Sequence, residues 1–307
     1  MNPVVLDPNS PTLKLRLPAT SANLGPCFDA AALALSLYLE IAATRASEFS
    51  LQASGRNPEI CGELRNNLLI QTYRNTLLAE GREPIPLALE MNNGIPLGMG
   101  CGSSAAVRLA GVALAAHFGH LGWSGERILA EACDLEGHPD NAAACWLGGF
   151  VAATREEKRV YAATLPPPPG WGALLLLPHE PLATTSARAV LPETYSREDV
   201  VANLQRATLL TTAFADGRGE LLRVAMQDRI HQPYREEICP LLPLLTPLAG
   251  RSGILGVALS GAGPAVLLLV EERALPEARA LAGETTQGIH GLELLSCQLE
   301  VSGVAYL

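Results

Sequence analysis

A glycine-rich segment followed by two serines is the part of this sequence best suited to binding an anion. Residues 94–106 read GIPLGMGCGSSAA, and an apolar run with helical spacing follows directly. Glycines let the backbone approach a ligand closely, and amides at the start of a helix attract negative charge. We therefore predict a phosphate-binding loop at this point, with its bend at Gly98, Gly100 and Gly102.

Two familiar nucleotide loops do not account for this segment. The P-loop pattern GxxxxGK[ST] is absent, and the chain holds only two lysines, Lys14 and Lys158. The dinucleotide pattern GxGxxA is present, but Pro96 and its neighbours separate it from the preceding strand, which that motif should follow at once. A glycine-rich turn with a serine cap is the simpler alternative. A phosphate loop that works without a lysine remains our prediction.

The stretch PLGMGCGSSAA closely resembles the second motif of the GHMP kinases, PxxxGxGSSAA. In that family the loop wraps the phosphates of ATP through backbone amides. Asn67 stands where the family contacts adenine, although it also suits the N-cap of the following helix. Cys101 stands where leucine is common, and we expect a change in packing without a redox role. The resemblance thus assigns ATP to Asn67, Pro96, Leu97, Gly98, Met99, Gly100, Cys101, Gly102, Ser103, Ser104, Ala105 and Ala106.

The same resemblance implies a magnesium site beside the loop. Mg²⁺ prefers hard oxygen ligands, commonly one carboxylate beside the phosphates of its nucleotide. Ser104 is the expected hydroxyl ligand. Glu136 is the expected carboxylate, and Glu131, five residues earlier, is the alternative.

Further motifs resemble one branch of the family, the homoserine kinases. PATSANLGPCFDAAALAL begins at Pro18, and SGAGPAVLLLV begins at Ser260. EGHPDNAAACWLGG, TTSARAVLP and DRIHQPYR lie between them in the order of that branch. The resemblance implies ATP-dependent phosphorylation of the L-homoserine hydroxyl to O-phospho-L-homoserine, a step toward threonine. Another GHMP small-molecule kinase, or a non-catalytic ligand-binding relative, is the alternative.

A zwitterionic substrate with a hydroxyl makes specific demands on side chains. Its carboxylate calls for guanidinium forks, which Arg188 and Arg235 would supply, and Asp29 suits its ammonium group. Simpler roles exist, because the arginines could be solvated, and the histidine and asparagine of the GHPDN turn could hold that turn or cap a helix. The resemblance assigns six residues to the substrate: Asn23, Asp29, His138, Asn141, Arg188 and Arg235.

We expect the phosphoryl transfer to proceed without a dedicated base. Some GHMP kinases carry an Asp–Lys pair for this purpose, but the first motif here is free of lysine. Direct attack of the hydroxyl, with late loss of its proton, then needs mainly positioning and charge neutralisation. The residues expected around the transferring group are Asn141, Asp140, Ser104 and Glu136. Cys27 replaces the glycine usual in the first motif, and its side chain is expected to strain that bend or narrow the substrate pocket.

The elements that position these residues predict an α+β fold. The resemblance implies a ribosomal S5-like N-terminal domain over residues 1–160, which binds ATP, and a ferredoxin-like C-terminal domain over 161–307. Alternating or apolar runs indicate strands at 13–17, 38–44, 49–53, 87–91, 147–154 and 173–177. Helical spacing marks 67–81, 103–118, 125–135, 199–227 and 272–283. We expect loops at residues 18–26 and 184–192 and an exposed connection at 166–170, which reads PPPPG. Residues 256–270 are expected to form a hairpin.

Composition narrows the partners. The formal net charge of −9 disfavours nucleic acid and anionic membranes. No signal peptide is recognisable in the first 15 residues, and no apolar run of about 20 residues predicts a membrane span. Seven cysteines without a CxxC pair indicate reduced, core-filling thiols. We therefore expect a cytoplasmic protein with a small-molecule substrate, and the family resemblance allows a homodimer.

Overall fold

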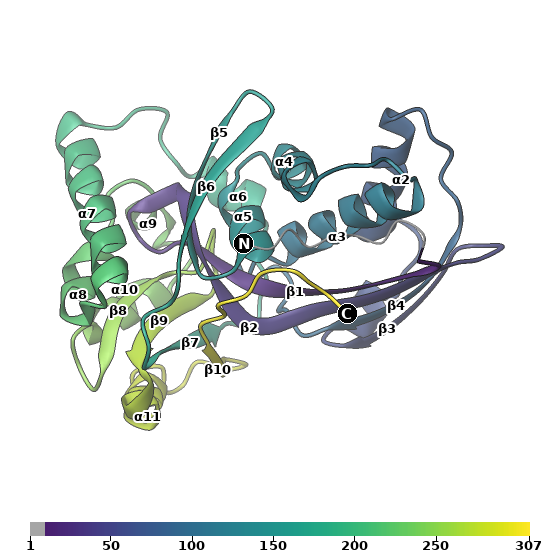
Figure 1. Ribbon diagram of the computed structural model, residues 1–307. Coiled ribbons are helices and arrows are strands. Elements are labelled where there is room, and N and C mark those ends of the chain that lie inside the picture. The colour runs from purple at the N-terminus through teal and green to yellow at the C-terminus, as the bar shows by residue number, and fades with distance from the viewer. Residues whose placement is uncertain (1–9) are drawn as a thin grey trace.

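The computed structural model describes residues 10–307, so the first nine residues of the expected signal-free N-terminus lie outside the described residues. Within this range the chain builds two separate sheets, each covered by helices (Figure 1). This mixture of sheets and helices confirms the expected two-domain α+β fold.

The first sheet has seven strands within the described range. Its main path runs β11-β1-β2-β4-β3, and β5 pairs with β2 and with β6. Four helices, α2 to α5, pack on one face of this sheet or on one another (Figure 1). The strands are β1 (Thr12–Asn23), β2 (Cys27–Arg45), β3 (Ser50–Gly55), β4 (Leu87–Asn93), β5 (Phe150–Glu156), β6 (Arg159–Leu165) and β11 (Ala305–Tyr306). The helices are α1 (Pro58–Cys61), α2 (Leu68–Ala79), α3 (Ser103–Phe118), α4 (Gly125–Glu136) and α5 (Asp140–Leu147).

The second sheet is antiparallel and has the order β10-β7-β9-β8. Counted along the chain this is fourth, first, third, second, with helices in the two crossovers, as expected for a ferredoxin-like domain. Its strands are β7 (Trp171–Leu177), β8 (Ile254–Leu259), β9 (Val266–Glu271) and β10 (Glu293–Gln298). Its helices are α6 (Thr184–Ala189), α7 (Arg197–Asp216), α8 (Leu222–Ala225), α9 (Gln232–Arg235), α10 (Leu241–Leu245) and α11 (Leu275–Thr285).

The continuous apolar run ALLLL in β7 is explained by burial of both faces of the second sheet. Leu175 and Leu177 pack into a core shared with the first sheet. Leu174 and Leu176 pack into a second core under α10 and α11. Because successive side chains point to opposite faces of a strand, all four leucines are buried without alternation in the sequence. The shared core joins the two domains.

Three expectations about local structure were wrong. Residues 18–26 form no long loop, because β1 continues to Asn23 and pairs with β2 across a tight turn. The polar residues Thr20, Ser21 and Asn23 suggested a loop, but they are buried residues of β1. Residues 184–189 form helix α6. The helix expected over 199–227 ends at Asp216, because Gly217 adopts a left-handed conformation that caps α7.

The pairing of β6 and β11 bears on where the two domains divide. β6 extends to Leu165 and pairs with β5 in the first sheet, so the expected boundary after residue 160 would cut this hairpin. β11 returns to the first sheet at the end of the chain. We propose that the division lies in the 166–170 connection, and that the last residues belong with the N-terminal domain.

Candidate active site

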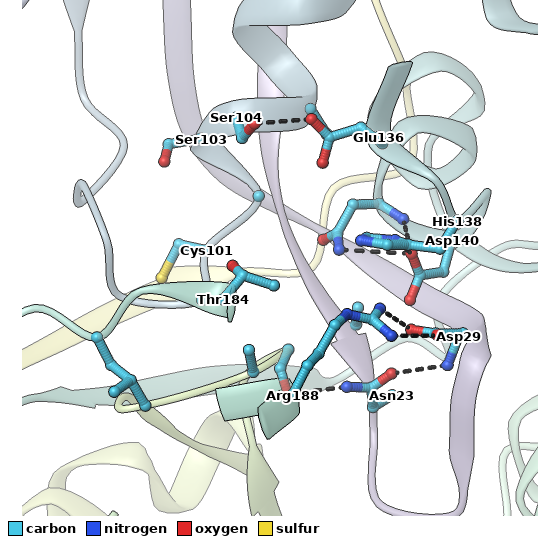
Figure 2. A pocket seen from close by; sticks show the side chains of 18 of the residues that line it. Asn23, Asp29, Cys101, Ser103, Ser104, Glu136, His138, Asp140, Thr184 and Arg188 are labelled. Carbon is cyan, nitrogen blue, oxygen red and sulfur yellow. Dashed lines mark hydrogen bonds and ion pairs between the residues drawn. The ribbon is translucent and has the colours of Figure 1, made fainter. Parts of the chain in front are cut away.

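One cavity of about 510 Å³ lies where the two domains meet, and all the residues expected at the substrate and part of those expected at ATP line it (Figure 2). The first domain contributes the glycine loop, the start of α3 and the start of α5. The second contributes α6, Arg235 from α9 and the turn between β8 and β9. All six residues expected at the substrate line the cavity, together with Gly98, Gly100, Cys101, Gly102, Ser103, Ser104, Ala105, Glu136 and Asp140.

The glycine loop needs its glycines because neighbouring motifs press against it. A Cβ on Gly100 would lie 2.0 Å from the carbonyl oxygen of Ser260. A Cβ on Gly102 would lie 1.9 Å from the Thr20 hydroxyl, and both glycines have positive φ. Ser260 Oγ also donates to the Gly100 carbonyl at 2.8 Å, and the Thr20 amide donates to the Cys101 carbonyl at 3.1 Å. The segments that contain Thr20, the glycine loop and Ser260 therefore pack together at the N-terminus of helix α3.

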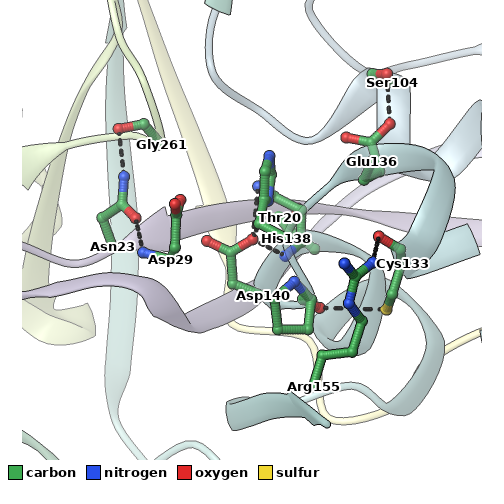
Figure 3. A network of polar contacts seen from close by, with 12 residues as sticks. Thr20, Asn23, Asp29, Ser104, Cys133, Glu136, His138, Asp140, Arg155 and Gly261 are labelled. Carbon is green, nitrogen blue, oxygen red and sulfur yellow. Dashed lines mark hydrogen bonds and ion pairs between the residues drawn. The ribbon is translucent and has the colours of Figure 1, made fainter. Parts of the chain in front are cut away.

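Ser104 and Glu136 face one another beside this loop (Figure 3). Ser104 Oγ donates to Glu136 Oε1 at 2.7 Å, and the Glu136 side chain is only 9% exposed. Two cis ligands of an octahedral Mg²⁺ lie about 3 Å apart, given metal–oxygen distances of about 2.1 Å. The two oxygens thus fit a magnesium site. Glu131 pairs instead with Arg127 at 3.2 Å and does not line the cavity.

Some residues expected at ATP lie away from the cavity wall. The Asn67 side chain caps α2 by accepting from the amides of Leu69 and Ile70, and its amide group donates to Cys61. The simpler role weighed for Asn67 is therefore present. Four further residues expected at ATP do not line the cavity: Pro96, Leu97, Met99 and Ala106, the last of which lies in α3.

The opposite end of the cavity holds a two-point ion pair. Arg188 donates to both carboxylate oxygens of Asp29, at 2.7 and 2.9 Å (Figure 2). Asn23 orients Asp29, because its Oδ1 accepts from the Asp29 amide at 3.0 Å while its Nδ2 donates to Gly261 at 2.8 Å. Asp29 and Arg188 were expected to bind opposite charges of one ligand. In the structure they form an ion pair with each other.

Arg235 approaches the same place from the second domain and is almost fully buried. Its Nη1 donates to Nδ1 of His231 at 2.9 Å, and Nε2 of His231 lies 2.8 Å from the Gly25 carbonyl. Because a carbonyl can only accept, Nε2 carries the proton and Nδ1 is free to accept from Arg235. Burial lowers the pKa of His231, which agrees with a neutral ring. Burial and the nearby charge of Arg188 also lower the pKa of Arg235. A bound anion would oppose both effects.

The GHPDN turn supplies a third group of polar side chains (Figure 3). Asp140 is 1% exposed, and its Oδ1 lies 2.6 Å from His138 Nδ1 and 2.7 Å from the Asn141 amide. Asn141 Oδ1 accepts from the Thr20 hydroxyl at 2.6 Å. Burial lowers the pKa of His138, but the hydrogen bond and charge of Asp140, with the charge of Asp29, outweigh it and raise that pKa above its ordinary value. Asp140 thus holds the turn and orients the two side chains that face the cavity.

Both unusual cysteines are packing residues. Cys27 is buried, does not line the cavity and has no positive φ, so it neither narrows the pocket nor strains the bend. Cys101 does line the cavity, but it is 1% exposed. Burial raises the pKa of both thiols to about 12, which keeps them protonated and unreactive. Each cysteine in the described part of the chain is free.

Sequence reasoning missed three residues that shape the site, namely Arg108, Phe28 and His231. Arg108 lines the cavity next to Ser104 and Glu136. Phe28 contacts Arg188 and Arg235, whose guanidinium carbons are 5.4 and 5.5 Å from its ring centre, and it stacks on His231. Arg108 sits one helical turn after Ser104, which is a signal that could have found it. Nothing in the local sequence placed Phe28 beside His231, because 203 positions separate them.

Over residues 10–307, no helix combines the length and the apolar character needed to cross a bilayer.

The chain matches two models of one known protein family. A family model of the GHMP kinases N terminal domain matches residues 67–149, and one of the GHMP kinases C terminal domain matches residues 210–284. The first match contains the glycine loop, Ser104, Glu136 and the GHPDN turn. The second begins within α7 and contains Arg235 and the turn between β8 and β9.

Curated proteins extend the likeness over most of the chain. A homoserine kinase from Solibacter usitatus is 46% identical over 260 residues, which are 84% of this chain and 84% of that protein. A homoserine kinase from Deinococcus radiodurans is 38% identical over 259 residues, again 84% of each. The crystal structure of homoserine kinase from Cytophaga hutchinsonii superposes with a TM-score of 0.82 at 24% identity, covering 97% of this chain and 98% of that one. That structural match shows the fold.

Proposed function

The chain belongs to the homoserine kinases of the GHMP kinase family, and we propose that it phosphorylates the hydroxyl of L-homoserine with ATP, in the cytoplasm, to give O-phospho-L-homoserine and ADP. The observation that carries this proposal is the single cavity. It combines a lysine-free phosphate loop at one end with an Asp29–Arg188–Arg235 cluster at the other.

The charged cluster suits an α-amino acid. Arg188 and Arg235 both contact the ring of Phe28 and together offer two guanidinium groups to a carboxylate. Asp29, held by Asn23, offers a carboxylate to an ammonium group. A zwitterion supplies one charge to each side, its ammonium group to Asp29 and its carboxylate to the two arginines, and so replaces the Asp29–Arg188 pair. His138 and Asn141 lie toward the phosphate loop, where the substrate hydroxyl would be placed.

Ser104 and Glu136 are proposed to hold Mg²⁺ against the phosphates of ATP. Their facing oxygens, the limited exposure of Glu136 and the pairing of Glu131 with Arg127 support this choice. When bound, the metal would supply positive charge to the transferring phosphoryl group. Loop amides at the start of α3 and the dipole of that helix would supply the rest.

We propose that no side chain acts as a dedicated base. Asp140 is almost fully buried, and its Oδ1 already accepts hydrogen bonds from His138 and Asn141. These contacts suit a residue that positions the turn. Asn141 and His138 would then orient the substrate hydroxyl for direct attack on the γ-phosphate, and the proton would leave late, to a phosphate oxygen.

A coupled ADP-release assay over homoserine, threonine, serine and mevalonate tests the proposal. We expect homoserine to be preferred and ³¹P NMR to show a phosphate ester on its hydroxyl. Preference for mevalonate would indicate another GHMP small-molecule kinase. Tight homoserine binding without ADP release would indicate a non-catalytic relative. Either result would overturn the proposal.

A further inference from the structure

Arg108 contacts both residues proposed to hold the metal. Its Nε lies 2.7 Å from Glu136 Oε1 and donates to Ser104 Oγ at 3.4 Å. Its Nη1 donates to the carbonyl of Leu135, at the C-terminal end of α4. The guanidinium group thus occupies the cation position beside the Ser104–Glu136 pair that Figure 3 shows.

The positive charges around the cavity are unevenly distributed. Among the described residues that line it there are three arginines and no lysine. Arg188 and Arg235 lie at the substrate end, and both contact the ring of Phe28. Arg108 is therefore the arginine available to a triphosphate at the loop end. Its side chain is 28% exposed, which leaves the guanidinium group access to the cavity.

A metal held by Ser104 and Glu136 would compete with Arg108 for the same carboxylate oxygen. Glu136 Oε1 accepts from Ser104 and is also the oxygen closest to Arg108 Nε. A divalent cation on this oxygen would lie next to the guanidinium group, and like charges at that separation repel strongly. The guanidinium group must then turn away from Glu136. Because it is anchored one turn into α3, the nearest anionic partner within the cavity would be the nucleotide.

We propose that Arg108 is a phosphate-binding residue that exchanges partners, pairing with Glu136 in the empty enzyme and with the triphosphate of ATP in the loaded one. The exchange keeps every charge paired, because Glu136 passes from guanidinium to metal while Arg108 passes from carboxylate to phosphate. It also supplies the cation that a lysine provides in P-loops. This inference rests on the proposed function, specifically on ATP and Mg²⁺ at the Ser104–Glu136 end.

A purely structural role makes different predictions. If Arg108 only ties α3 to the end of α4 through Leu135, its removal would lower stability and leave nucleotide affinity unchanged. In that case freeing Arg108 from Glu136 would bring no gain in nucleotide binding. Nucleotide affinity in the absence of metal therefore separates the two roles.

The test measures ATP affinity by calorimetry in EDTA, for the wild type and for variants with matched thermal unfolding midpoints. Arg108→Met should bind metal-free ATP about 10- to 100-fold more weakly, as expected for a lost charge-assisted hydrogen bond. Glu136→Gln should bind it more tightly than the wild type, because Arg108 is no longer held by a carboxylate. The gain should disappear in the Glu136→Gln, Arg108→Met double variant.

Two results would overturn the inference: wild-type ATP affinity in Arg108→Met, or no gain in Glu136→Gln. If Arg108→Met does not fold, Arg108→Lys, which keeps the charge but loses the planar fork, should show intermediate affinity, and unchanged affinity would contradict the exchange. Wild-type turnover of homoserine with MgATP is measured alongside. Turnover with unchanged ATP affinity in the variants refutes only the role of Arg108, whereas absent turnover refutes the proposed function.

Discussion

The two ends of the cavity are built from different parts of the polypeptide. The phosphate end is mainly backbone, with glycines so closely packed that a Cβ on Gly100 or Gly102 would collide with a neighbouring motif. The substrate end is made of side chains from both domains, including Asp29, Arg188 and Arg235. Backbone amides bind any phosphate chain, whereas placed charges select one substrate. In our proposal, phosphate binding therefore resides at the first end and substrate specificity at the second.

Each end also holds an ion pair, and the two pairs differ. Arg108 contacts Glu136 through Nε on a single carboxylate oxygen, while Arg188 grips both oxygens of Asp29. In our account MgATP separates the first pair, because its metal would bind Glu136 and its phosphates would bind Arg108. The second is opened by one zwitterion. In this account a ligand separates either ion pair only if it offers an opposite charge to each member of that pair.

The largest effect is expected at the substrate end, from Arg235→Met. Removing one member of a buried, hydrogen-bonded charge cluster costs roughly 2–5 kcal/mol, or about 30- to several thousand-fold in affinity. We expect kcat/KM for homoserine to fall by about that factor while KM for MgATP changes little. Steady-state kinetics with each substrate varied in turn checks this. An equal loss for both substrates would contradict the division of the cavity.

A smaller effect is expected at the phosphate end, from Glu136→Gln. The Mg²⁺ concentration needed for half-maximal rate should rise by about 10- to 100-fold or more, since even outer-shell changes reach that range. Glu131→Gln is the matched control and should leave the Mg²⁺ dependence unchanged, because Glu131 pairs with Arg127 away from the cavity. Measuring the rate of both variants as a function of Mg²⁺ concentration shows which glutamate binds the metal.

Asp140→Asn tests direct transfer between the two ends. Asparagine keeps an oxygen for the hydrogen bond from the Asn141 amide. We expect kcat to fall by about tenfold, from looser placement of His138. General base catalysis contributes roughly 10²–10⁴-fold. Single-turnover kinetics that show a loss at the upper end of that range, with unchanged substrate binding, would refute transfer without a base.

Cys27→Gly should have the smallest effect. The thiol is buried and does not line the cavity. Homoserine kinetics should therefore change by less than about twofold, while the added backbone freedom of glycine in a strand costs roughly 0.5–1 kcal/mol of stability. Thermal unfolding and kinetics of the same preparation measure both quantities. A marked change in substrate preference would show that the first motif depends on this position.

Much of this site could be predicted from the sequence where local pattern decides structure. The helix expected at 103–118 coincides with α3, and the 256–270 hairpin appears as β8 and β9. The polar segment 18–23 was mistaken for a loop, because its pairing with β2 and its burial against distant motifs leave no local signature. The same limit applies to His231, whose partners Gly25 and Arg235 meet only in the folded chain.

The most direct test of the central claim removes one charge of the substrate at a time. We compare kcat/KM for L-homoserine, for 4-hydroxybutanoate, which lacks the ammonium group, and for 3-aminopropan-1-ol, which lacks the carboxylate; all three keep the hydroxyl. If the Asp29–Arg188 pair yields only to a zwitterion, each analogue should lose about 100-fold or more, since each leaves a charge in the cavity without a partner. Turnover of either analogue within about tenfold of homoserine would contradict this account.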